Sequence, residues 1–246
     1  MQPLQRLIAA DGYEVMLFPL EYMYMSQDEG GGFSHAGTLQ IDFLGWGSFG
    51  RVYECPYYAP CTCRCVGTTD AAAHNRIYQS VNQVHLADGT LGIVTFEVAH
   101  DNNPPHNVGD TVVQGQLLGH TGTAGHVTGD HLHYQCARGA YAGWEQVPPN
   151  NNWQLVNEMH IYDACFVNDT VIVEGYNHDW ITYNGPTPPP EEEQRKKFPW
   201  VLYSRKLRTN RANVWHFALF IVYFWVRRRC RWLNIVLKIY HQELMN

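Results

Sequence analysis

The stretch NVGDTVVQGQLLGHTGTAGHVTGDHLHY, residues 107–134, carries the strongest indications of fold and of chemistry in this chain. Its recurring glycines mark tight turns between short runs of β-branched and apolar residues. The stretch ends in His131-Leu132-His133, and alternate residues of a strand point to the same side of a sheet. The sequence therefore predicts two imidazoles side by side, where one can ligate a metal while the other handles a proton.

A similar pattern of short β-branched and aromatic runs, broken by Gly, Asn, Asp or Pro, extends over residues 13–183. It predicts a mostly β fold. One segment, His74–Leu86, has apolar residues near helical spacing and is expected to form a short helix. The strands are expected at Thr38–Leu44, Cys61–Val66, Leu91–Ala99, Leu117–His120, His131–Gln135 and Asp169–Glu174.

The composition is that of a chain with a substantial buried core. Of the 246 residues, 45% are hydrophobic, 13% aromatic and only 16% charged. Such values exclude disorder for most of the chain, and a long coiled coil would need far more Lys and Glu. A chain of this length has room for one sizeable domain with an appendage.

The net charge of −6 hides two oppositely charged parts. Residues 1–193 carry 5 Lys and Arg against 22 Asp and Glu, a net charge of −17, whereas residues 194–246 carry 12 against 1, a net charge of +11. The acidic part repels nucleic acid, and no nucleic-acid partner is expected. The basic part could meet an anionic membrane or a wall polymer, or simply remain solvated.

The changes of charge and composition along the chain predict three regions: a domain over residues 1–183, a Pro-rich and charge-rich linker over 184–198, and a basic, aromatic tail over 199–246. The tail contains the apolar run Val214–Val226. A membrane-spanning helix needs about 20 such residues. A run this short is more typical of an interfacial segment or of packing on a partner.

Upstream of the histidine pair, His35 and Asp42 are the next candidates for a site. With one imidazole of His131 and His133 they would form a set of two histidines and one aspartate. A catalytic zinc site uses three protein ligands of this N/O type and leaves the fourth position to water. His100 ends an expected strand and could face the same cleft.

With these residues in place, the chain resembles the lysostaphin-type zinc metallopeptidases, which cut peptidoglycan cross-bridges. The resemblance covers roughly residues 15–140 and is carried by VGDTVVQGQLLG (108–119) and TGDHLH (128–133) together with the candidate histidines. It implies an antiparallel β-sheet or sandwich of the lysostaphin type, a duplicated hybrid motif. It also implies a Zn²⁺ cofactor and peptidoglycan peptide bridges as the substrate.

The resemblance assigns a role to each candidate residue. His35, Asp42 and His133 become the zinc ligands, and His131 and His100 become the catalytic histidines. In the implied mechanism zinc acidifies a bound water and polarises the scissile carbonyl, and His131 takes the proton of the water. His100 then hydrogen-bonds the oxyanion or relays a proton to the leaving amine.

One departure from the family concerns the first two ligands. The family separates them as His-x3-Asp, whereas six residues lie between His35 and Asp42. Regular strand geometry would put the two side chains on opposite faces. A bulge or turn at Gly37 would let them converge. A regular strand there would instead indicate a non-catalytic structural protein that retains the peptidase fold.

The cysteines and the N-terminal segment bear on where the protein acts. Cys61, Cys63 and Cys65 share one face of a strand, and buried thiols, a disulfide and a metal site all remain open for them. Residues 1–14 lack the pattern of a secretory signal. We therefore expect synthesis in a host cytoplasm and action at the bacterial cell wall, as a phage endolysin or a virion-associated enzyme.

Overall fold

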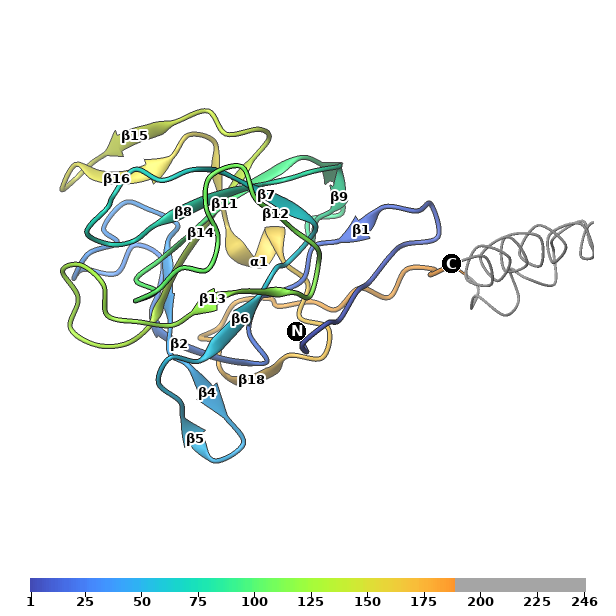
Figure 1. Ribbon diagram of the computed structural model, residues 1–246, viewed down its shortest axis with the longest axis horizontal. Helices are drawn as coiled ribbons and strands as arrows, with labels where there is room; N and C mark the ends of the chain where they lie inside the picture. The colour runs from blue at the N-terminus through green and yellow to red at the C-terminus, as the bar shows by residue number, and fades with distance from the viewer. Residues whose placement is uncertain (189–246) are drawn as a thin grey trace, which may run out of the picture. The chain divides into compact units, whose positions relative to one another are not determined.

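A nine-stranded sheet, in which strands distant in sequence lie side by side, organises the fold (Figure 1). The computed structural model describes residues 1–188. Neighbouring strands run antiparallel except β18 and β2, which are parallel. Along the sheet the order is β12 (Thr111–Val112), β7 (Cys63–Gly67), β8 (Arg76–Ser80), β11 (Val94–Ala99), β14 (Leu132–Arg138), β3 (Ile41–Phe43), β2 (Tyr22–Gln27) and β18 (Val171–Glu174), and β17 (Glu158–Met159) also pairs with β14.

Smaller elements surround this sheet. Two hairpins matter most for the site, and in Figure 1 they lie on opposite sides of the sheet centre. They are β4 (Trp46–Gly47) with β5 (Gly50–Arg51), and β15 (Trp144–Val147) with β16 (Asn152–Leu155). The remaining elements are β1 (Glu14–Val15), β6 (Pro56–Tyr58), β9 (Val84–His85), β10 (Leu91–Gly92), β13 (Leu117–His120) and the short helix α1 (Ile161–Ala164).

The central strands separate an apolar core from a polar face. In β14, Leu132 and Tyr134 are fully buried in the main apolar cluster, while the alternate residues His133 and Gln135 point to the other face. The neighbouring strand β3 alternates in the same way, because Ile41 and Phe43 are buried in the apolar core on either side of Asp42. Sequence alternation thus places the polar candidates on one face of the sheet.

The expectation of a mostly β fold is confirmed, and each of the six expected strands overlaps an observed strand. The helix expected over His74–Leu86 is wrong, because this segment forms β8 and β9. Strand β8 is hydrogen-bonded between β7 and β11, where both Ile77 and Tyr78 are buried. A strand covered on both faces loses the alternation that would have identified it.

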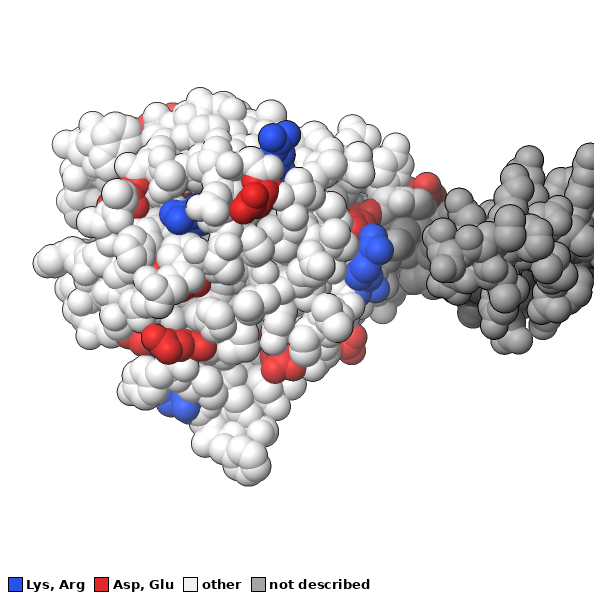
Figure 2. Space-filling view, in the orientation of Figure 1, with Lys and Arg blue, Asp and Glu red and all other residues white. Residues whose placement is uncertain are grey.

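The cysteines within residues 1–188 carry free thiols. All six cysteines within residues 1–188 are free and buried, and burial raises the pKa of the Cys61 and Cys63 thiols well above the usual value. Uncharged side chains cover most of the face in Figure 2, with a few separate acidic and basic groups.

The C-terminal expectations fall largely outside the described part of the chain. Most of the linker over 184–198, the tail over 199–246 and the apolar run Val214–Val226 lie beyond residue 188. Within residues 1–188, no helix has the length and apolar character needed to cross a membrane.

Candidate metal centre

Asp42 and His133 face each other because β3 and β14 pair directly at these residues. The Nδ1 atom of His133 lies 3.0 Å from Oδ1 of Asp42. Burial alone would raise the pKa of Asp42, but the neighbouring His133 and His35 hold it well below the usual range. The pKa of His133 is raised in turn, because the contact with Asp42 outweighs the effect of burial. A carboxylate and an imidazole are therefore fixed side by side by the sheet register.

His35 reaches the same point from a turn rather than from a strand. The backbone N–H of His35 donates to the carbonyl of Gly31, and that of Thr38 donates to the carbonyl of His35. Gly37 has φ +85°, in the left-handed region, and a Cβ there would lie 1.9 Å from the carbonyl oxygen of Pro148. The turn at Gly37 thus brings His35 and Asp42 together despite the six residues between them.

Three donor atoms converge at this point in a way that suits a metal ion. His35, Asp42 and His133 each offer one ligand atom, and these atoms lie within 4.8 Å of one another. Nε2 of His35 is buried, lies 3.3 Å from Oδ1 of Asp42 and makes no hydrogen bond. A buried nitrogen without a hydrogen bond is costly unless a ligand satisfies it. Two imidazoles and one carboxylate are a donor set that first-row divalent cations accept.

Two further histidines stand beside the donors. Nε2 of His131 lies 3.6 Å from Oδ1 of Asp42, and the His100 ring centre lies 4.7 Å from that of His131. Each ring directs Nδ1 to a backbone carbonyl at 2.8 Å, from Gly129 for His131 and from Ala124 for His100. Since a carbonyl can only accept, Nδ1 carries the proton in both rings and a neutral ring has its lone pair on Nε2.

Two features of His100 bear on its chemistry. Burial, with the nearby His133 and His131, lowers the pKa of His100 to about 4. His100 also has φ +77°, which is uncommon outside glycine. Such conformations persist where the surrounding structure enforces them, often at functional sites. His100 is therefore a neutral base at pH 7.

These groups lie in an open groove of about 950 Å³ on the polar face of the sheet. Tyr53 follows the β4–β5 hairpin on one wall, and Trp144 and Trp153 come from the β15–β16 hairpin on another. Phe33, from the loop before His35, is 75% exposed and also lines the groove. An extended polymer chain could enter such a groove and reach the donor cluster at its floor.

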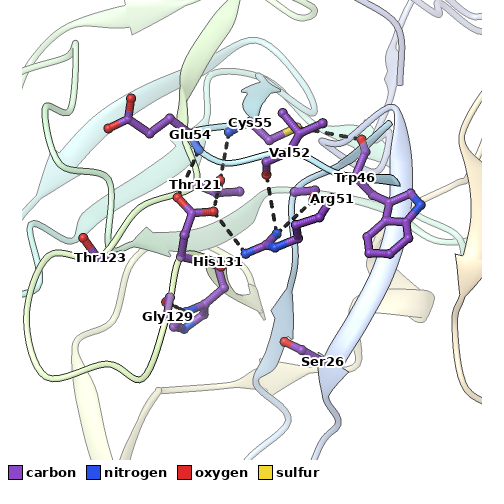
Figure 3. Close-up of polar contacts among 12 residues, drawn as sticks. Ser26, Trp46, Arg51, Val52, Glu54, Cys55, Thr121, Thr123, Gly129 and His131 are labelled. Carbon is purple, nitrogen blue, oxygen red and sulfur yellow. Dashed lines mark hydrogen bonds and ion pairs between the residues drawn. The ribbon is translucent and has the colours of Figure 1, made fainter. Parts of the chain in front are cut away.

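A buried carboxylate ties one wall of the groove to His131. Asp130, directly before His131, accepts hydrogen bonds from Thr121 Oγ1 at 2.7 Å and from the backbone N–H of Glu54 at 3.0 Å. The Arg51 guanidinium, in β5, pairs with the same carboxylate and donates to the backbone carbonyl of Asp130. Figure 3 shows Arg51 pointing toward the segment of His131, with Thr121 and Glu54 close by.

The loop that carries His35 is fixed from the C-terminal part of the described chain. Nδ1 of His35 donates to the carbonyl of Asp28 at 3.3 Å, and the Asp28 carboxylate accepts from His178 at 2.7 Å. Glu158 accepts from the backbone N–H of Leu39 at 2.8 Å. Residues 158–178, outside the stretch of family resemblance, thus help to place a candidate ligand.

The structure brings all five sequence candidates, His35, Asp42, His100, His131 and His133, to one site. Their roles remain predictions. Sequence reasoning missed the supports around them: Asp28, Arg51, Asp130, Glu158 and also Glu97, whose carboxylate lies 3.9 Å from Nε2 of His133. Only Glu97 left a signal in the sequence, a carboxylate inside the apolar strand Val94–Ala99. The other supports depend on contacts between distant segments.

Comparison with known proteins finds relatives in sequence and likenesses in structure. No family model matches the sequence. The chain is 41% identical over 172 residues to a protein named morphogenesis protein 1 from Bacillus phage B103, and the match takes in 70% of this chain and 45% of that protein. The chain thus spans a little under half the length of this curated relative.

Three of the similar solved structures have low sequence identity to this chain. A zinc-containing peptidase from Vibrio cholerae matches at TM-score 0.38 and 14% identity, over 63% of this chain and 46% of that one. The catalytic domain of lysostaphin from Staphylococcus simulans matches at 0.34 and 20%, over 54% and 85%. A prophage-encoded M23 protein of Enterococcus faecalis matches at 0.35 and 17%, over 48% and 82%. At these low scores, the residues of the site remain the basis for a functional proposal.

Proposed function

We propose that this protein is a zinc-dependent endopeptidase that hydrolyses peptide cross-links of bacterial peptidoglycan, as a phage endolysin or a virion-associated enzyme. The observation that carries the proposal is the convergence of His35, Asp42 and His133 beside two further histidines in an open groove. Three N/O ligands with room for water are typical of catalytic rather than structural zinc. The motif at residues 128–133 supports the same class of enzyme.

The flanking histidines supply the proton chemistry. Bound zinc would lower the pKa of its water and polarise the scissile carbonyl. Nε2 of His131 faces the metal site and takes the proton of the attacking water. His100 holds its proton on Nδ1 against the Ala124 carbonyl, so its Nε2 has no proton to give to the oxyanion or the amine by itself. In a relay, His131 would pass the proton taken from the water to Nε2 of His100, whose ring centre lies 4.7 Å away, and His100 would hand it on to the leaving amine.

A second candidate function is that of a structural virion protein that retains the fold without catalysis. The name of the phage relative, morphogenesis protein 1, favours it. That relative is more than twice as long as the matched part, so its name describes a larger protein. The two candidates differ in whether zinc binds and whether peptide bonds are cut.

The test measures zinc content and cell-wall hydrolysis for the full chain, for His133→Ala and for His85→Ala. His85 lies in β9 outside the groove and contacts Asp11, so it serves as the matched control. We expect about one zinc per chain and loss of wall turbidity for the full chain and the control, and neither for His133→Ala. New free amines without new reducing sugars identify peptide rather than glycan cleavage. If the full chain binds no zinc and hydrolyses none of a broad panel of cell walls, the result would contradict the proposal and favour the structural role.

A further inference from the structure

Glu97 lies beneath His133 on the groove floor and carries a buried carboxylate. It belongs to β11, next to β14, and is 4% exposed. Its Oε2 atom lies 3.9 Å from Nε2 of His133, the ring nitrogen that faces away from Asp42. His133 therefore stands between two carboxylates, with Asp42 at one nitrogen and Glu97 at the other.

The amides around Glu97 are oriented so that both donate to it. Gln135 uses its amide oxygen to accept from the backbone N–H of Leu155 at 2.9 Å, so its NH₂ group faces Glu97, to which it donates. Asn75 uses its amide oxygen to accept from the backbone N–H of Thr69 at 2.9 Å, and its NH₂ group donates to Glu97 at 2.6 Å. Glu97 is thus held as an acceptor, and its remaining polar neighbour is His133.

We propose that Glu97 is a positioning residue: its carboxylate, 3.9 Å from Nε2 of His133, attracts the proton of His133 to Nε2 without a direct hydrogen bond and thereby favours the tautomer in which Nδ1 is unprotonated and free for the metal. This inference rests on the proposed zinc site. A metal-bound histidine generally donates its other N–H to a carboxylate, a carbonyl or water, which fixes its tautomer and orientation. His35 follows the same pattern, since its Nδ1 donates to the carbonyl of Asp28 and leaves Nε2 free.

The test compares zinc affinity in the full chain, in Glu97→Gln and in Glu14→Gln. A glutamine at position 97 has one amide oxygen and one NH₂ group. It cannot face Asn75, Gln135 and His133 with an acceptor oxygen at the same time. Glu14 is the matched control. Its carboxylate is also mostly buried and accepts hydrogen bonds, from the backbone and the hydroxyl of Thr62, but it lies in β1 outside the groove.

We expect Glu97→Gln to weaken zinc binding at least tenfold in competition with a chelator, within the 10–100-fold typical for such partners. The control should stay within about twofold of the full chain. The absorption spectrum of the cobalt-substituted protein should shift for Glu97→Gln alone, because the geometry of His133 changes. Glu97→Asp, which withdraws the carboxylate by one methylene, should fall between the two and covers the case in which Glu97→Gln does not fold.

The outcomes separate this inference from the proposed function. Full chain and control that bind zinc, together with position-97 variants of equal affinity and unchanged cobalt spectrum, would overturn the positioning role and leave the zinc site standing. A purely structural role would lower the free energy of unfolding of the metal-free variant without changing the zinc affinity of its folded form, and that result also overturns the inference. A full chain that binds no zinc would overturn both.

Discussion

Asp42 and His133 are register partners in adjacent antiparallel strands, with Oδ1 and Nδ1 3.0 Å apart. Because side chains alternate between the faces of a sheet, a slip of one residue would turn one of them into the apolar core. The core residues beside them therefore help to fix the candidate metal site. His35 lacks this constraint and depends on a turn.

That dependence predicts the effect of Gly37→Ala. The new Cβ would collide with the carbonyl of Pro148, and the residue would have to keep φ +85°. We expect a loss of at least about 1 kcal/mol in the free energy of unfolding and weaker zinc binding. Gly32→Ala is the matched control, since a Cβ there has no neighbour within 4 Å. Denaturant titration and chelator competition measure both effects, and equal results for the two variants would contradict the role of the turn.

Substitutions of the two proposed catalytic histidines should separate activity from metal content. His131→Ala and His100→Ala each remove a proton-transfer group but no candidate ligand. We expect kcat on cross-linked wall peptides to fall about 100-fold or more, with zinc content close to that of the full chain. His106→Ala, outside the groove, is the control. A variant that loses zinc and activity in parallel would show that its histidine is a ligand instead.

Removing Asp130 should weaken the wall of the groove. Asp130→Ala leaves Thr121, Arg51 and the N–H of Glu54 without their acceptor. We expect a loss of roughly 2 to 4 kcal/mol in the free energy of unfolding, as for other buried, hydrogen-bonded carboxylates. The exposed Asp110→Ala should cost less. A loss of equal size at both positions, measured by denaturant titration, would argue against the bridging role.

Glu158 should make the stability of the metal-free protein depend on pH. Burial raises the pKa of Glu158 from about 4.5 to about 7 in the folded state. The unfolded chain releases this proton first, so stability falls as pH rises from about 4.5 to 7. The Glu158→Gln variant has no carboxyl group at this position, so its stability does not fall in this way as pH rises. Relative to the intact chain it should gain on the order of 3 kcal/mol between pH 4.5 and pH 8.

Unfolding titrations in the presence of a chelator at several pH values measure this gain. The chelator keeps the pH dependence of metal binding out of the comparison. Parallel stability curves for Glu158→Gln and the intact chain would mean that Glu158 already ionises normally in the folded protein.

Local patterns predicted the strands with one polar face and the residues of the candidate site. Alternation along residues 131–135 pointed to the pair His131 and His133, and glycine positions indicated the turns. The segment His74–Leu86 escaped because a strand buried on both faces shows no period of two. The partners of Asp130 and Glu158 escaped for another reason. They join residues 76 and 119 positions apart, and no local pattern encodes such contacts.

The supports of the His35 loop have a practical consequence for shortened versions of the protein. A chain cut after residue 140, where the family resemblance ends, would keep every candidate ligand. It would lose Pro148, which faces the turn at Gly37, and Glu158, which holds the backbone of Leu39. Such a truncation would keep every residue of the motif, yet we expect it to bind metal poorly. The shortest fragment that can bind metal well must include the residues that hold the His35 loop, and it therefore extends through at least His178.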